Sequence, residues 1–265
     1  MASWEDVPPL PLRNDLPDLR PADEPTHRHD PGTAYWVDRA LTTQGVGAVL
    51  PAGRWLRYHA WTNALLHRFT LSRLDRRRFR RFVDLGCGRG EWTALFAERA
   101  DEVHACDVAL PFVHETRGRL EAIGHRASFV EQADIRDFRV PSGTDLAYLG
   151  AVLLYLPDPV ALGLLRRLRA AMVRDGQLVI RDYCTFNFGT PSVNHVTGYS
   201  VHRRAEDVVA LARDAGFRCR EVRASPSIYA EVMGNRITRW PLRVAWRLAT
   251  LHWLRASHTF VFRAG

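Results

Sequence analysis

The fold is decided by the stretch Phe82-Val83-Asp84-Leu85-Gly86-Cys87-Gly88-Arg89-Gly90-Glu91-Trp92. An apolar run stops at an acidic residue, three glycines follow at alternate positions, and a segment with helical character comes next. This order predicts a strand, a tight loop and a helix. Glycine allows positive φ and lets a ligand approach the main chain, so the loop is expected to hold a nucleotide-like ligand. The dinucleotide fingerprint G-x-G-x-x-G would need glycine at position 91, and Glu91 there argues against NAD and FAD.

The segment from Asp84 to Gly90 resembles the first motif of the class I S-adenosylmethionine-dependent methyltransferases. In that family the loop passes under the methionine part of the cofactor. The resemblance implies S-adenosyl-L-methionine as the cofactor. It also implies a cofactor site that includes Asp84, Gly86, Gly88 and Gly90.

Strands and helices alternate after the glycine loop. We expect further strands at 102–106, 127–130, 145–150, 177–182, 217–224 and 259–263, helices at 109–122 and 159–173, and a helix-like linker between the third and fourth strands. Regular alternation predicts an α/β fold with a doubly wound, mostly parallel seven-stranded sheet and helices on both faces. Ligands of such sheets bind outside the carboxyl ends of the strands, next to the first strand.

Acidic residues follow the second and third expected strands. Asp107 lies where a carboxylate can accept hydrogen bonds from both ribose hydroxyls, with Val108 against the adenine face; the alternative is a helix N-cap. The segment that contains Asp134 and Ile135 resembles the family segment in which the acid accepts from the adenine amino group and the next residue packs on the ring. The alternative for Asp134 is a surface turn.

The fourth and fifth strands are expected to border the acceptor. Gly150 ends the fourth strand and keeps the wall thin beside the sulfonium, whereas Asp145 begins that strand and should be structural, at the far edge of the sheet. The Asn/Asp-Pro-Pro-Tyr/Phe motif is absent here, which argues against methylation of adenine, cytosine or glutamine. A hydroxyl acceptor needs a general base. His195 is the first candidate, with Asp182 and Tyr183 behind it; the alternative for His195 is a loop histidine in water.

The remaining segments suggest one domain with additions. Residues 1–32 are rich in proline and acids and predict a disordered or extended arm, and residues 33–265 form a single methyltransferase domain. Its N-terminal part, 33–80, is predicted to hold two helices, 34–50 and 54–74, that either pack on the core or form a lid over the cofactor and the substrate cleft.

A basic amphipathic helix is predicted in an insertion, 226–257, before the last strand. Packing on the core or on a second subunit, in a possible homodimer, is one interpretation. A membrane surface or a lipid substrate contacted through 238–255 is the other.

The composition limits the function classes. All 37 basic residues are arginine and the net charge is +8; the absence of lysine looks like codon bias, which weakens an argument for nucleic acid. The arginine run 76–81 predicts a solvated helix end or, alternatively, a phosphate-binding patch. The chain has no long apolar run and no signal peptide, so a cytoplasmic location is expected. No pair of acids with an asparagine marks a divalent metal site, and we predict no metal.

These patterns together predict an S-adenosylmethionine-dependent methyltransferase that acts on an oxygen or nitrogen of a small molecule, such as a secondary metabolite, lipid or sugar derivative. In-line transfer needs the acceptor atom about 3–3.5 Å from the methyl carbon. One alternative is an RNA methyltransferase, motivated by the arginine-rich segments 76–81 and 236–255, although no RNA-binding module is recognisable. The other is a protein of this fold that binds the cofactor without methyl transfer.

Overall fold

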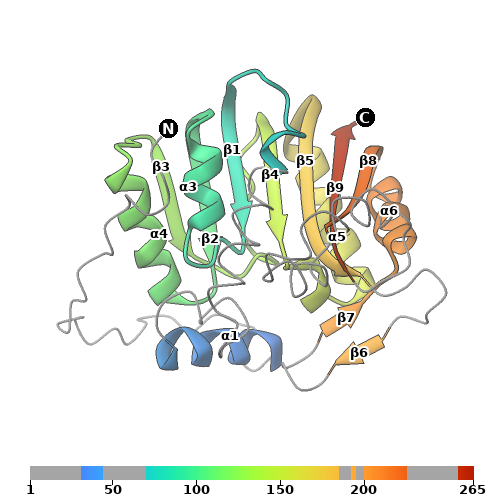
Figure 1. The fold of residues 1–265 in the computed structure, drawn as a ribbon, viewed down its shortest axis with the longest axis horizontal. Coiled ribbons are helices and arrows are strands. Elements are labelled where there is room, and N and C mark those ends of the chain that lie inside the picture. The colour runs from blue at the N-terminus through green and yellow to red at the C-terminus, as the bar shows by residue number, and fades with distance from the viewer. Residues whose placement is uncertain (1–30, 44–69, 185–191, 195–199, 226–255) are drawn as a thin grey trace, which may run out of the picture.

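The computed structural model describes residues 31–43, 70–184, 192–194, 200–225 and 256–265 (Figure 1). Most of the predicted arm, the second N-terminal helix up to residue 69, His195 and the insertion 226–255 lie outside the described residues. The predictions made for those segments therefore stay predictions.

Seven strands form one sheet, as the sequence predicts (Figure 1). Their order across the sheet is β3 (Ser128–Gln132), β2 (Ala100–Asp107), β1 (Phe79–Leu85), β4 (Thr144–Gly150), β5 (Met172–Cys184), β9 (Ala256–Ala264) and β8 (Phe217–Ser225). All neighbouring pairs are parallel except those that β9 makes with β5 and β8. The chain leaves β1 toward β2 and later returns to β4 on the other side of β1. This reversal creates a switch point between β1 and β4.

Helices cover both faces of the sheet, as predicted (Figure 1). The helices α3 (Glu91–Ala97) and α4 (Leu110–Ala122) pack on one face, and α5 (Asp158–Ala171) and α6 (Ala205–Asp214) pack on the other. Aromatic rings pack together in the first of these two cores, where Trp92 of α3 stacks on Tyr148 of β4 at 5.2 Å between ring centroids. The predicted doubly wound architecture is confirmed.

Four features of the strands and their connections differ from the sequence predictions. The linker between β3 and β4 contains turns rather than a helix. Strand β5 begins at Met172, where a helix was expected to continue, and Asp175 takes a positive φ of 59° in this part of the strand. Residues 256 and 257 belong to β9 instead of the insertion. Finally, β6 (Ser192–Asn194) and β7 (Ser200–His202) form an antiparallel pair that we did not predict.

Helix α1 (Pro31–Thr42) lies across the edge of the sheet at which β1 and β4 end (Figure 1). It begins three residues before the predicted start, with Pro31 in the first turn, where a missing backbone N–H costs no hydrogen bond. Trp36 packs against Phe112 of α4. Among the helices within the described ranges, none is long and apolar enough to cross a membrane. The cytoplasmic location stays a prediction.

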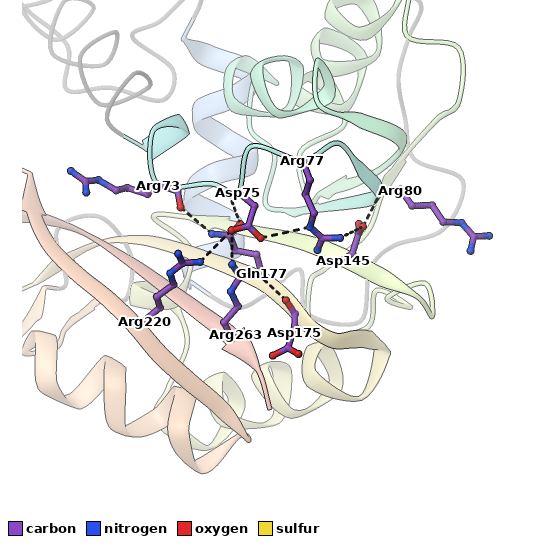
Figure 2. Close-up of polar contacts among 9 residues, drawn as sticks. All are labelled: Arg73, Asp75, Arg77, Arg80, Asp145, Asp175, Gln177, Arg220 and Arg263. Atoms are coloured by element: carbon purple, nitrogen blue, oxygen red, sulfur yellow. Dashed lines mark hydrogen bonds and ion pairs between the residues drawn. The ribbon is translucent and has the colours of Figure 1, made fainter.

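Charged and polar side chains from five segments meet at the opposite edge, at the amino ends of β1, β4 and β5 (Figure 2). We call this group the amino-edge cluster; it contains Asp75, Arg77, Asp145, Gln177, Arg220 and Arg263. Asp75 lies at its centre, with Oδ1 2.5 Å from Arg263 Nη2 and 3.2 Å from Arg220 Nη1. These bonds attach the segment before β1 to strands β8 and β9.

Two members of the amino-edge cluster, Asp145 and Arg77, contact the segment at the start of β1 or the carboxylates of the cluster. Asp145 accepts the backbone N–H groups of Arg80 and Arg81 at 3.0 and 2.9 Å, which confirms that it is structural. Arg77 lies 3.6 Å from Asp75 and 3.7 Å from Asp145. The arginine run that suggested a phosphate patch is therefore partly paired with carboxylates, at the edge of the sheet away from the switch point.

Candidate functional site

A cavity opens at the carboxyl ends of β1, β2 and β4, where a switch-point ligand is expected. Thr33 and Trp36 of α1 contribute to its wall. Its other lining residues are Asp84, Gly86, Cys87, Gly88, Arg89, Glu91, Trp92, Asp107, Val108, Phe112, Asp134, Ile135, Arg136, Tyr148, Gly150, Ala151, Val152, Tyr155, Leu156 and Arg181. All of the predicted cofactor residues except Gly90 are among them. Single-sequence reasoning about strand ends thus located one shared cavity.

The glycine loop has the backbone that its sequence predicted. Gly86, Gly88 and Gly90 take φ values of 78°, 52° and 77°, in the left-handed region that disfavours side chains. A Cβ on Gly86 would lie 2.6 Å from a methyl carbon of Val152. A Cβ on Gly90 would lie 2.7 Å from the backbone of Thr116 in α4. Gly90 therefore lies behind the cavity wall and lets the loop pack on α4, rather than facing a ligand.

Asp84, at the end of β1, is a buried carboxyl with an unused acceptor. Its Oδ2 accepts a hydrogen bond from Thr93 of α3 at 2.7 Å. Its Oδ1 is buried and has no hydrogen-bond partner among the described residues. Burial raises the pKa of Asp84 to about 7. A buried oxygen without a donor favours a ligand that brings one, and a cation would suit this position best.

Asp107, at the end of β2, is a buried carboxyl that backbone N–H groups already hold. Its Oδ2 accepts from Gly88 N at 2.8 Å and its Oδ1 from Ala109 N at 3.0 Å, so it joins the glycine loop to the start of α4. Burial raises its pKa to about 6 despite these bonds. Each carboxylate oxygen accepts a second bond, so hydroxyl groups of a ligand can still be bound here. Val108 follows in the same wall.

Asp134 follows β3 and faces the cavity, but an arginine already holds it. Its Oδ1 accepts from Arg136 N at 2.8 Å and from Arg136 Nε at 2.9 Å, and its Oδ2 lies 2.6 Å from Arg136 Nη2. The backbone bond is a turn of the kind weighed as the alternative. Arg136 Nη2 also donates to Thr33 at 3.1 Å, which attaches α1 to this wall. The turn and the cavity position coexist.

The end of β4 forms the wall opposite the glycine loop. A Cβ on Gly150 would lie 2.6 Å from the hydroxyl of Tyr148, so only glycine leaves that ring in place. Ala151 has a positive φ of 57°, which is strained for a residue with a side chain. Tyr155 meets Trp36 of α1 edge to face at 5.5 Å. This wall is therefore aromatic and tightly fitted.

The structure does not bring the predicted backup bases to the cavity. Asp182 is 3% exposed, and the side-chain alternation of β5 directs it to the face opposite Arg181. Its Oδ1 accepts from Tyr183 N at 2.9 Å, and burial raises its pKa to about 7. Tyr183 is 38% exposed and does not line the cavity either. His195 lies outside the described residues, so its role as a base stays a prediction.

Sequence reasoning overlooked Arg181. It follows Leu178, Val179 and Ile180 in a strand whose apolar residues are buried, and an arginine there is an available signal. Cys87 also lines the cavity, but burial raises the pKa of that thiol well above its ordinary value. Within the described ranges, no group of three or more His, Cys, Asp or Glu is placed to hold a metal ion.

Comparison with known proteins gives consistent results. A family model described as a methyltransferase domain matches residues 82–176. A trans-aconitate 2-methyltransferase from Mycobacterium tuberculosis is 30% identical over 190 residues, which are 71% of this chain and 66% of that protein. This chain therefore spans just under two thirds of the length of that relative.

Solved structures share the fold at low sequence identity. The 1,6-didemethyltoxoflavin N1-methyltransferase from Burkholderia thailandensis, with its substrate and S-adenosylhomocysteine bound, has a TM-score of 0.62 at 17% identity, over 92% of each chain. The cyclase SpnF has a TM-score of 0.61 at 17% identity, over 90% of this chain and 96% of that chain.

The sheet order and the glycine-loop cavity define a Rossmann-like methyltransferase domain. With the family match, the relatives and the structural neighbours, they show that the chain belongs to the class I S-adenosylmethionine-dependent methyltransferases.

Proposed function

We propose that the protein methylates a small-molecule acceptor with S-adenosyl-L-methionine as the methyl donor. The observation that carries this proposal is the unused buried Oδ1 of Asp84 beside the glycine loop and Asp107. A ligand made of an amino acid joined to a nucleoside needs three things from its site. These are a carboxylate oxygen for its ammonium group, a carboxylate that accepts from its ribose hydroxyls, and a glycine backbone that it can approach closely.

The residues fit the cofactor part by part. Asp84 would accept the ammonium group of the methionine part, Asp107 would hold the ribose hydroxyls, and Val108 and Ile135 would pack on the adenine ring. Asp134, which lines the same cavity, would accept from the adenine amino group. When bound, S-adenosylmethionine supplies a methyl group activated on a sulfonium sulfur. The contribution of the protein is to position both partners and keep water out.

The walls support a small acceptor. Trp36, Tyr148 and Tyr155 give the cavity aromatic surfaces, and α1 covers its edge. The relative named above acts, by its name, on trans-aconitate, and the Burkholderia enzyme on 1,6-didemethyltoxoflavin. Both are small molecules. The proposal includes methylation of an oxygen or nitrogen atom of the acceptor. If that atom belongs to a hydroxyl group, His195 is the proposed base.

Calorimetry with S-adenosylhomocysteine, the demethylated cofactor, tests the proposal. The wild type should bind it, and Asp107→Ala should bind it at least about tenfold more weakly, because hydrogen bonds to a charged group contribute about 1.5–3 kcal/mol. Asp101→Ala is the matched control, since Asp101 lies on the same strand at the other end and is exposed. Failure of the wild type to bind would overturn the proposal.

A second arm identifies the chemistry. The protein is incubated with methyl-labelled cofactor and, separately, a set of small acids and amines, a metabolite extract, and RNA. Label in a small molecule supports the proposal, whereas label in RNA supports the alternative. Tight cofactor binding without product from any source would instead indicate a protein of this fold that does not transfer methyl groups.

A further inference from the structure

Arg181 is a buried cation in the cavity wall with no carboxylate partner among the described residues. It ends the apolar run of β5, is 8% exposed and lines the cavity. Its Nε donates to the hydroxyl of Tyr148 at 3.3 Å, and its guanidinium lies 5.0 Å from the centre of the Trp92 ring. Both contacts are with neutral groups. They fix the orientation of the guanidinium but do not neutralise its charge.

Such a charge is costly unless something compensates it. A guanidinium carries five N–H donors and stays protonated at all ordinary pH values. Loss of a proton therefore cannot remove the energetic cost of burying its charge. The nearest acid in sequence, Asp182, is directed to the opposite face of β5. Asp84, on the same face, forms no ion pair with Arg181, and burial favours its neutral form.

Two other arginines of this chain, the buried Arg203 and the half-buried Arg136, show how a protein carboxylate compensates such a charge. Arg203 is 3% exposed, and its side chain bonds Asp158 at 2.8 Å as well as the carbonyl groups of Leu153 and Leu156. Arg136 is held by Asp134. Arg181 is nearly as buried as Arg203, but it lines a cavity, whereas Arg203 faces protein oxygens. The missing oxygens are therefore expected to come from a ligand.

We infer that Arg181 is the anion receptor of the cavity and binds a carboxylate group of a ligand. This inference rests on the proposed function and narrows it. A planar guanidinium that lies over Trp92 and bonds the Tyr148 hydroxyl presents paired N–H groups that match the two oxygens of a carboxylate. Two sources supply such a group: the methionine part of the cofactor, or an acidic acceptor. Arg181 is paired in the sheet with Gly150, so it lies at the wall that both ligands would approach.

The test uses two variants and two nucleoside probes. Arg181→Met removes the charge but keeps an unbranched side chain, and Arg181→Lys keeps the charge but loses the fork of donors. Arg218→Met, an exposed arginine on β8, is the control. Each protein is titrated with S-adenosylhomocysteine and with 5′-methylthioadenosine, which lacks the amino-acid part. Each S-adenosylhomocysteine complex is then titrated with trans-aconitate and malonate as carboxylate probes.

Two results support the inference and identify the source. If the cofactor supplies the carboxylate, Arg181→Met binds S-adenosylhomocysteine at least about tenfold more weakly and 5′-methylthioadenosine normally. If the acceptor supplies it, nucleoside binding is unchanged and the affinity for a carboxylate probe falls at least about tenfold. In either case Arg181→Lys falls between the wild type and Arg181→Met, because one donor pair is lost.

Unchanged affinity for every probe in Arg181→Met overturns the inference, and so does an equal loss of both nucleosides, which would indicate a damaged fold. Thermal melting identifies the second outcome. If the Arg181 side chain serves only the packing of the fold, Arg181→Met should be clearly less stable than the wild type. Failure of the proposed function is distinct, since the wild type would then bind neither nucleoside.

Discussion

The two edges of the sheet use the same residue types in opposite ways. At the amino edge, Asp75 is surrounded by arginines, and its hydrogen bond with Arg263 holds its pKa below its ordinary value of 3.8. At the carboxyl edge, burial raises the pKa of Asp84 to about 7 and of Asp107 to about 6. Charges at the amino edge are satisfied by protein groups. At the carboxyl edge, Asp84 Oδ1 has no hydrogen-bond partner and Arg181 has no ion-pair partner among the described residues, which favours ligand binding at this edge.

The first prediction concerns the glycine loop at the carboxyl edge, where a substitution should weaken both folding and ligand binding. Gly90→Ala should cost about 2–4 kcal/mol of unfolding free energy, since alanine is strained at a φ of 77° and its Cβ would meet the backbone of Thr116. Affinity for S-adenosylhomocysteine should fall with it. Urea denaturation and calorimetry measure both effects.

Gly118→Ala is the control for that change. Gly118 lies in α4 with open space around the position of a Cβ, so alanine there should stabilise the protein by up to about 1 kcal/mol. Equal stability of Gly90→Ala and the wild type would show that the loop does not depend on close packing against α4.

The second prediction addresses the amino edge. Asp75→Asn keeps the shape of the side chain but removes the charge opposite Arg263 and Arg220, and it should cost about 1–3 kcal/mol at pH 7 with unchanged affinity for S-adenosylhomocysteine. Asp101→Asn, which breaks an exposed pair, should cost less than about 1 kcal/mol.

The pH dependence of the Asp75 effect has a definite sign. The pKa of Asp75 is lower in the folded than in the unfolded protein, so its contribution is complete above about pH 3.8 and is lost as the pH falls through the folded pKa. Denaturation at pH 6 and pH 3 should therefore show a smaller difference between Asp75→Asn and the wild type at pH 3. A difference that does not shrink would place the stabilisation elsewhere.

Local signals in the sequence were sufficient for the architecture and for one side of the site. Asp84 and Asp107 could be placed because each ends a predicted strand, and parallel strands end at one edge; Asp134 was placed by the resemblance of its segment to the family. Arg181 could not be assigned a role without knowing which face of β5 meets Tyr148 and Trp92. The contact of Gly90 with Thr116 depends in the same way on how α4 packs.

The amino-edge cluster was beyond single-sequence reasoning for a different reason. The bond between Asp75 and Arg263 joins positions 188 residues apart in the sequence, and no local pattern records such a pair. The arginine run was interpreted as a helix end because its charges looked solvated. In the structure Arg77 and Arg81 have carboxylate partners instead.

The third prediction sharpens the contrast through the titration of Asp84. A carboxyl whose pKa is higher in the folded protein stabilises the fold most at low pH and loses that contribution as the pH rises toward 7. An ammonium ligand at Oδ1 reverses this preference because it binds only the ionised form. Affinity for S-adenosylhomocysteine should therefore fall about eightfold between pH 7.5 and pH 6, the cost of expelling one proton from a group with a pKa of about 7.

The control ligand for this experiment is 5′-methylthioadenosine, which keeps the ribose but has no ammonium group. Titration of Asp107, with a pKa of about 6, affects both ligands, so the difference between their pH profiles isolates Asp84. Asp84→Asn cannot take up the proton and should make the two profiles parallel. If the profiles are already parallel in the wild type, Asp84 does not receive the ammonium group, and its unused oxygen must have another donor.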